Sequence, residues 1–148
     1  MRVLFVGSSG GHLAQMLPLA APDGDRYHWV SFATPDARSK LAGESVTWGH
    51  FPTTRNLPNL VRNWKQARSV LAEFRPDVVV STGAGIALPY FVLARRRGIR
   101  TIYLEVIDRI ATRTLTGRLV YPFATEFLVQ WSRQQRLYPD STVVGPVI

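Results

Sequence analysis

Two glycine-rich segments, and the polar side chains that follow them, are the parts of this chain best suited to chemistry. In the first segment, five residues from Gly7 to Gly11 lead directly into His12. Glycines after a buried strand let the backbone turn tightly and bring unpaired amide groups close to an anion. A histidine at such a turn can donate to a phosphate or accept a proton near neutral pH. The pattern predicts a phosphate or diphosphate site formed by Gly7, Ser8, Ser9, Gly10 and Gly11.

This first segment departs from the two best-known nucleotide-binding patterns. Ser9 stands where the dinucleotide pattern G-x-G-x-x-G has its second glycine, and no Gly-Lys-Ser/Thr follows as in a P-loop. An alternative is that the glycines only allow a close turn from strand to helix in an ordinary α/β fold. His12 favours the functional interpretation, although a single histidine is more often structural.

The second segment follows the apolar run Val78-Val79-Val80 and precedes a predicted helix, so it repeats the geometry of the first. Open parallel sheets bind ligands beyond the carboxyl ends of their strands, near the point where the strand order reverses. We therefore expect both loops at one edge of the sheet, joined there by Glu105 and Asp108. Alternatively, Glu105 is a helix cap and Asp108 pairs with a nearby arginine. The residues of this segment expected to line the cleft are Thr82, Gly83, Ala84 and Gly85.

The segments around these loops alternate between strand-like and helix-like patterns. Strands are predicted at 2–6, 27–33, 46–48, 78–80, 101–104 and 126–129, and helices at 13–17, 56–75 and 86–97. Near-continuous apolar strands alternating with helices are typical of a parallel sheet covered on both faces. With 148 residues and 46% hydrophobic content, the chain is expected to form one Rossmann-like α/β domain over residues 1–148.

Composition restricts the ligands and partners. Eighteen Lys and Arg against ten Asp and Glu give a formal charge of +8, which favours nucleic acid, an acidic membrane surface or phosphorylated substrates. Without cysteine there can be no disulfide or thiolate metal site, a composition compatible with a reducing cytoplasm. We expect no metal and no cofactor. No segment reaches the roughly 20 apolar residues of a membrane span, so membrane contact should be peripheral.

Nucleic-acid binding is the main alternative from another class. The charge suits it, but the chain has no helix-turn-helix, zinc-finger or RNA-binding signature, and its basic residues are dispersed. Nucleic acid is therefore not an expected partner. A dinucleotide-binding Rossmann-like protein is a second alternative, weakened by the glycine spacing and by the lack of an acidic residue after a clean second strand.

Five short motifs follow one another along the chain. They are Gly7-Ser8-Ser9-Gly10-Gly11-His12-Leu13, Ser81-Thr82-Gly83-Ala84-Gly85, Tyr103-Leu104-Glu105, Leu115-Thr116-Gly117-Arg118-Leu119 and Gln130-Trp131. In this order they resemble the Alg14-like oligosaccharide biosynthesis family over nearly the whole chain. In eukaryotes that family supplies the membrane-anchoring, acceptor-side subunit of a split N-acetylglucosaminyltransferase. Its bacterial relatives assist a second subunit in building exopolysaccharide or capsule repeats on undecaprenyl diphosphate.

The motifs also resemble the amino-terminal half of the single-chain glycosyltransferase that makes the peptidoglycan lipid precursor. In that GT-B fold the amino-terminal half faces the lipid-linked acceptor, and the carboxyl-terminal half holds most of the UDP-sugar. The chain ends at Ile148, where the second half would begin. The resemblance thus implies a half enzyme with two partners: a catalytic, donor-binding glycosyltransferase subunit and a polyprenyl-diphosphate-linked sugar acceptor. The expected donor is a UDP-sugar such as UDP-GlcNAc, UDP-Glc or UDP-Gal.

The resemblance also implies roles for individual residues. By position, Gly10, Gly11 and His12 would approach the acceptor's diphosphate or its reacting hydroxyl, and Gly83 to Gly85 would line the cleft. Glu105 stands where the family has a cleft-facing carboxylate. Sugar transfer with inversion needs a general base on the acceptor hydroxyl, and His12 and Glu105 are both candidate catalytic residues.

The predicted helix at 56–75 is basic and amphipathic, which suggests contact with an anionic membrane surface. The alternative is an ordinary helix that packs its apolar face on the sheet. Eukaryotic members of the family carry an amino-terminal membrane helix, whereas this chain starts at its first strand. We therefore expect a cytoplasmic protein, peripheral on the inner face of the cell membrane. The candidate membrane contacts are Leu57, Leu60, Arg62, Trp64 and Lys65.

Overall fold

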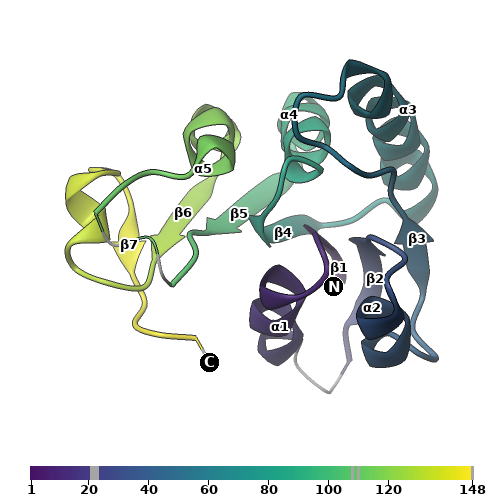
Figure 1. Ribbon diagram of the computed structural model, residues 1–148, viewed down its shortest axis with the longest axis horizontal. Helices are drawn as coiled ribbons and strands as arrows, with labels where there is room; N and C mark the ends of the chain where they lie inside the picture. The colour runs from purple at the N-terminus through teal and green to yellow at the C-terminus, as the bar shows by residue number, and fades with distance from the viewer. Residues whose placement is uncertain (21–23, 108, 110, 148) are drawn as a thin grey trace.

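The computed structural model describes residues 1–20, 24–107, 109 and 111–147, and its strands form one parallel sheet (Figure 1). The seven strands of this described part have the order β3-β2-β1-β4-β5-β6-β7. Every neighbouring pair is parallel, and the order reverses between β1 and β4. The strands are β1 (Arg2–Gly7), β2 (Arg26–Ser31), β3 (Val46–Trp48), β4 (Val78–Gly83), β5 (Arg100–Leu104), β6 (Glu126–Val129) and β7 (Thr142–Val143).

Helices cover both faces of this sheet. The α-helices are α1 (Gly11–Met16), α2 (Pro35–Lys40), α3 (Leu57–Phe74), α4 (Ala87–Arg96) and α5 (Leu115–Val120). Short 3₁₀ turns follow at η1 (Leu17–Leu19), η2 (Tyr121–Phe123) and η3 (Gln134–Arg136). Helices α3, α4 and α5 lie on one face, and α1 and α2 lie on the other (Figure 1). This arrangement confirms the predicted Rossmann-like α/β fold. In the described part of the chain, no helix combines the length and apolarity needed to cross a bilayer.

The core is divided between the two faces of the sheet. Leu4 and Val6 belong to the cluster packed under α3 and α4, whereas Val3 and Phe5 belong to the cluster with α1. Successive side chains of a strand point to opposite faces, so a strand covered on both sides must be apolar throughout. This is why β1 and β4 are near-continuous apolar runs in the sequence.

The ends of α3 explain where this helix begins and stops. The Asn56 side chain accepts from the backbone N–H of Asn59 at 3.0 Å, and Pro58 lies in the first turn, where a missing N–H costs nothing. At the other end Arg75 adopts a left-handed conformation with φ 52°. The predicted range of 56–75 therefore includes the two cap residues of the helix.

Two buried asparagines decide which face of α3 packs on the protein. The Asn63 side chain donates to His50 O at 2.9 Å and accepts from His50 N at 2.8 Å, while Asn59 Nδ2 donates to Pro52 O at 2.9 Å. Because these side chains occupy the inner face, Leu57 and Val61 remain 68% and 47% exposed. Leu71 is buried in the core and Trp64 and Phe74 pack against it, so the alternative of an apolar face packed on the sheet fits these residues but not Leu57 and Val61.

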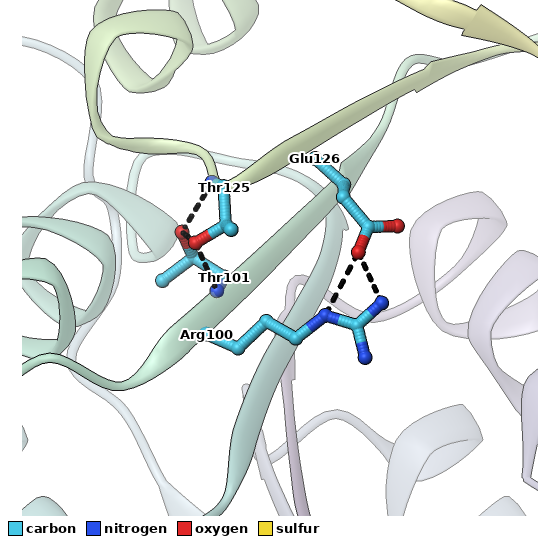
Figure 2. Close-up of polar contacts among 4 residues, drawn as sticks. All are labelled: Arg100, Thr101, Thr125 and Glu126. Carbon is cyan, nitrogen blue, oxygen red and sulfur yellow. Dashed lines mark hydrogen bonds and ion pairs between the residues drawn. The ribbon is translucent and has the colours of Figure 1, made fainter.

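Polar pairs fix the start of β5 against the start of β6 (Figure 2). The backbone N–H of Thr101 donates to Thr125 Oγ1 at 3.0 Å, and that of Thr125 donates to Thr101 Oγ1 at 2.9 Å. Arg100 Nε donates to Glu126 Oε1 at 2.8 Å, an exposed ion pair that contributes little by itself. Together these contacts set the register at this end of the two strands. Strand β5 then ends at Leu104, one residue before Glu105.

Candidate functional site

The two glycine loops meet because β1 and β4 are neighbours in the sheet, with Gly7 opposite Gly83. His12 and Thr82 join the loops directly. His12 Nδ1 lies 2.9 Å from Thr82 O, and Thr82 Oγ1 donates to His12 O at 2.7 Å. A carbonyl oxygen only accepts, so Nδ1 carries the proton in this contact and Nε2 is the basic nitrogen of the neutral ring. The two contacts therefore fix the orientation of the imidazole ring between the loops.

The imidazole ring of His12 lies against Gly83. A Cβ atom at Gly83 would be 2.7 Å from Nδ1 and 3.2 Å from Nε2 of His12, so no other residue fits. The φ of Gly83 is also +140°, which disfavours side chains. The strand β4 runs to Gly83 and not to Val80, and Thr82 and Gly83 are buried. The expectation that these two residues line the cleft is therefore wrong, because both lie within the strand and hold His12.

The other loop residues lie at different depths. Gly7 is buried, and a Cβ there would be 2.7 Å from Met16 Cε. Gly10 and Gly11 are exposed, and nothing lies within 4 Å of a Cβ at either. Gly10 has φ 73° and precedes α1, and its conformation directs the chain into that helix. Ser8 and Ser9 are half-buried beside these glycines.

A groove of about 970 Å³ opens beside the loops, within the roughly 300–1,000 Å³ typical of small-molecule sites. We call it the α3–α5 groove. Ser8, Ala84 and Gly85 reach it from the glycine loops. The remaining lining residues are Phe32, Thr53, Thr54, Arg55, Asn56, Leu57, Leu60, Leu88, Thr114, Leu115, Thr116 and Leu119.

Glu105 lies beneath the surface at this edge of the sheet. Its side chain is fully buried and accepts hydrogen bonds from Tyr138 Oη at 2.5 Å and from Thr114 Oγ1 at 3.0 and 3.1 Å. The backbone N–H of Val106 also donates to it at 3.1 Å. The expectation of a cleft-facing Glu105 is therefore wrong. Its carboxyl group is occupied by internal donors and is positioned to organise the structure around it.

Glu105 organises the start of α5. Thr114, which donates to Glu105, is the N-cap of this helix and accepts from Gly117 N at 2.9 Å. A Cβ atom at Gly117 would lie 2.5 Å from Tyr138 Oη and closer still to Glu105 Oε2, which explains the glycine in the motif at 115–119. Burial, together with the hydrogen bond to Glu105, raises the pKa of the Tyr138 phenol, so it remains a donor at neutral pH.

The Gln130-Trp131 motif holds the segment that follows β5. Gln130 Nε2 donates to Glu105 O at 2.9 Å, and Trp131 Nε1 donates to Ile107 O at 2.7 Å. Sequence reasoning missed Gln134, whose buried side chain donates to Val106 O and to Arg109 O, both at 2.9 Å. Only its spacing of four residues from Gln130 hinted at a shared function. Asp108 lies outside the described residues.

The candidate membrane residues on α3 are exposed to different degrees. Leu57, Arg62 and Lys65 are exposed, whereas Leu60 and Trp64 are half-buried. Leu60, Trp64 and Lys65 line a second hollow of about 340 Å³ along the helix. Sequence reasoning missed a further exposed pair, Leu115 and Leu119, at 70% and 45%. Their spacing of four residues was the available signal, but α5 was not predicted as a helix.

The charge around the site is positive and its polar groups are suited to anions. Arg55 is the one charged residue of the described chain that lines the α3–α5 groove. No three His, Asp or Glu side chains of the described residues are grouped so that they could hold a metal ion. The chemistry that this site can support on its own residues is anion binding and proton transfer at His12.

Comparison with known proteins gives a matching family and relatives. The family described as "Oligosaccharide biosynthesis protein Alg14 like" matches residues 50–147. The UDP-N-acetylglucosamine transferase subunit ALG14 of Homo sapiens is 31% identical over all of this chain and 83% of its own length. A Geotalea uraniireducens UDP-N-acetylglucosamine–N-acetylmuramyl-(pentapeptide) pyrophosphoryl-undecaprenol N-acetylglucosamine transferase is 27% identical, and the match covers 96% of this chain and 34% of that enzyme.

Solved structures agree on the fold. MurG of Acinetobacter baumannii aligns with a TM-score of 0.71 at 17% identity, over 89% of this chain and 42% of its own. The S. aureus MnaA–UDP co-structure aligns with a TM-score of 0.75 at 13% identity, over 99% of this chain and 44% of its own. The chain therefore spans less than half of each of these proteins. At these identities the likeness is one of fold.

The Glu105 cluster makes a prediction about stability. We expect Gly117→Ala to lower the free energy of unfolding by about 1–3 kcal/mol, because the added methyl overlaps the oxygens of Glu105 and Tyr138. Urea denaturation followed by tryptophan fluorescence measures this. Gly11→Ala is the matched control, since its Cβ would have nothing within 4 Å. Equal stability of the two variants would show that the cluster is not packed as described.

Proposed function

Because the chain belongs to the Alg14-like oligosaccharide biosynthesis family, we propose that it is the acceptor-binding subunit of a two-component glycosyltransferase. The partner subunit binds the UDP-sugar donor, with UDP-GlcNAc as the first candidate and UDP-Glc and UDP-Gal as alternatives. The acceptor is a saccharide linked to a polyprenyl diphosphate, in the synthesis of a bacterial surface polysaccharide. The observation that carries this proposal is the pair of glycine loops joined through His12 and Thr82 beside an apolar groove.

Two further facts support the proposal. Relatives that match along the whole chain are named as subunits of a UDP-N-acetylglucosamine transferase. The relative from Geotalea uraniireducens carries in its name an undecaprenol pyrophosphoryl acceptor, which is both anionic and apolar. The formal charge of +8 and the apolar groove of this chain suit such an acceptor.

In the proposed reaction His12 is the general base. The carbonyl of Thr82 accepts from Nδ1–H and orients the ring, and the imidazole takes the proton from the acceptor hydroxyl as the sugar is transferred. The exposed amides of Gly10 and Gly11, with Ser8 and Ser9, bind the diphosphate. Glu105 keeps a positioning role through Thr114 and α5, in place of the catalytic role first expected.

The proposed membrane contact is the exposed side of α3. Leu57 and Val61 are large apolar side chains in water, and exposed apolar patches mark interaction sites. Arg62 and Lys65 lie on the same helix and would meet anionic headgroups. The proposed location is therefore peripheral, on the inner face of the cell membrane, with the proposed lipid-linked acceptor in the same membrane.

Transfer by the reconstituted pair tests the proposed function. Membranes are prepared with this chain alone, with the candidate donor-binding partner alone, and with both, and each is supplied with radiolabelled UDP-GlcNAc, UDP-Glc or UDP-Gal. We expect label in extracted lipid only when both chains are present, because the donor and acceptor sites lie on different subunits. Full transfer by this chain alone, or no transfer by the pair with any donor, contradicts the proposal.

Replacement of His12 tests the proposed base. We expect His12→Gln to lower kcat by about 10²–10⁴-fold, because the amide retains hydrogen bonding but cannot take the proton. The acid limb of the pH–rate profile should disappear with it. Thermal unfolding of the variant shows whether the fold is intact. Near-normal kcat in a folded His12→Gln protein would remove His12 from proton transfer.

Glu105→Gln separates positioning from catalysis. We expect a loss of stability of about 1–3 kcal/mol, because the amide N–H₂ would face a hydroxyl donor, with most of kcat retained in the folded protein. Loss of kcat comparable to that of His12→Gln, at normal stability, would instead identify Glu105 as the base.

Vesicle binding tests the membrane contact. We expect the double variant Leu57→Ser, Val61→Ser to bind anionic vesicles about tenfold or more weakly, as measured by sedimentation. The reason is that two apolar side chains no longer insert into the membrane interface. Arg62→Gln and Lys65→Gln should each cost about 1 kcal/mol on anionic vesicles and nothing on neutral ones. Leu19→Ser, an exposed leucine in η1, is the control. Unchanged binding of the α3 variants would place the membrane contact elsewhere.

A further inference from the structure

The α3–α5 groove combines one charged end with apolar walls. Leu57 and Leu60 of α3 form one wall, and Leu115 and Leu119 of α5 form the other. Helix α4 lies between these two helices and supplies Leu88 to the groove (Figure 1). Polar side chains line the rest of the groove, namely Ser8, Thr53, Thr54, Asn56, Thr114 and Thr116, whereas the leucines offer only apolar contact. The walls therefore suit a hydrocarbon ligand.

The polar end of the groove lies at the second glycine loop. Thr53 packs on Gly85 so closely that a Cβ at Gly85 would be 3.1 Å from Thr53 Oγ1. Arg55 follows two residues later, and among the described residues no carboxyl group forms an ion pair with it. A cation without an ion pair to the described residues, at the rim of a groove whose other lining residues are uncharged, favours an anionic group there.

The backbone at Arg55 provides a second observation. Its φ of 50° is unusual for a residue other than glycine and costs of order 1 kcal/mol. Such conformations cluster at ligand sites. Arg75 has nearly the same φ of 52°, but there it ends α3, so that conformation has an ordinary structural reason. Arg55 ends no helix; it lies in the turn just before Asn56, the N-cap of α3, and lines the groove.

We propose that the α3–α5 groove holds the first isoprene units of the polyprenyl-diphosphate acceptor, with Arg55 as a second contact to the diphosphate that the first glycine loop binds, since Ser8 of that loop lines the same groove. This rests on the proposed function and deepens it, because it assigns the lipid part of the substrate to a defined seat. The remaining isoprene units of the lipid leave the groove past Leu57 and Leu115, which are 68% and 70% exposed at its rim. Since Leu57 also belongs to the proposed membrane face of α3, the groove opens directly toward the bilayer.

The role assigned to α5 explains why Glu105 is buried. Thr114 begins α5 and lines the groove, and its hydroxyl is fixed by the Glu105 carboxyl group. The carboxyl group thus determines the position of the leucine wall. A lipid site is preorganised when its apolar side chains are held in place, and the hydrogen bond between Thr114 and Glu105 holds α5 and its leucines in this way.

Calorimetric titration with farnesyl diphosphate, below its critical micelle concentration, tests this proposal on the chain without its partner. Inorganic diphosphate and farnesol are the comparison ligands. We expect farnesyl diphosphate to bind at least about tenfold more tightly than either, because only it fills both ends of the groove. Equal affinity for farnesyl diphosphate and inorganic diphosphate would overturn the proposal.

Matched variants locate the binding. Leu119→Ser should raise the Kd for farnesyl diphosphate about tenfold and leave that for inorganic diphosphate unchanged. Arg55→Gln should raise the Kd for farnesyl diphosphate and for inorganic diphosphate, and leave the Kd for farnesol unchanged. The controls are Leu19→Ser, 38% exposed in η1, and Arg75→Gln, with the same backbone conformation at the far end of α3. Wild-type affinity for farnesyl diphosphate in Leu119→Ser or Arg55→Gln would overturn the assignment.

The two-component transfer assay distinguishes this failure from failure of the proposed function. If the pair transfers sugar and Leu119→Ser keeps a normal KM for the lipid acceptor, the groove assignment is wrong and the function stands. If the pair transfers nothing while the chain binds farnesyl diphosphate as described, the groove assignment stands and the proposed function is wrong.

Discussion

The close approach of β1 and β4 at their carboxyl ends is the constraint on which the rest of this site depends. Two parallel strands that become neighbours where the sheet order reverses end at the same edge of the sheet, so the loops that follow them start next to each other before leading to opposite faces. Here the loops are also bonded to each other, through the imidazole and carbonyl of His12 and the carbonyl and hydroxyl of Thr82. Gly83 makes this possible, because any side chain there would occupy the space of the ring.

A second layer of buried polar contacts supports this edge of the sheet. Glu105 would be costly inside the protein if its oxygens lacked donors, and Tyr138 and Thr114 provide them. Gln130 and Gln134 do the same for backbone carbonyls of the segment after β5. The segments of the site without regular structure are thus held by side-chain hydrogen bonds where strand ladders cannot reach. Satisfied networks of this kind rigidify a structure.

Helix α3 packs on the protein partly through polar side chains and leaves apolar side chains exposed. Its inner face contains Asn59 and Asn63, which bind the backbone of residues 50–52. Leu57 and Val61, on another side of the helix, remain exposed. Exposed apolar side chains of this kind are suited to binding.

Sequence alone determined the fold class, because the apolar runs at 78–80 and 126–129 and the glycines that follow β1 are local signals with direct physical meaning. It also located His12 and both loops at one edge. It could not distinguish a cleft-facing Glu105 from a buried one, since that depends on Thr114 and Tyr138, which are 9 and 33 residues away along the chain. Nor could it find the short helix α5. Six residues span fewer than two turns, and what fixes them is the Glu105 cluster and the packing on α4, which exist only in the tertiary structure.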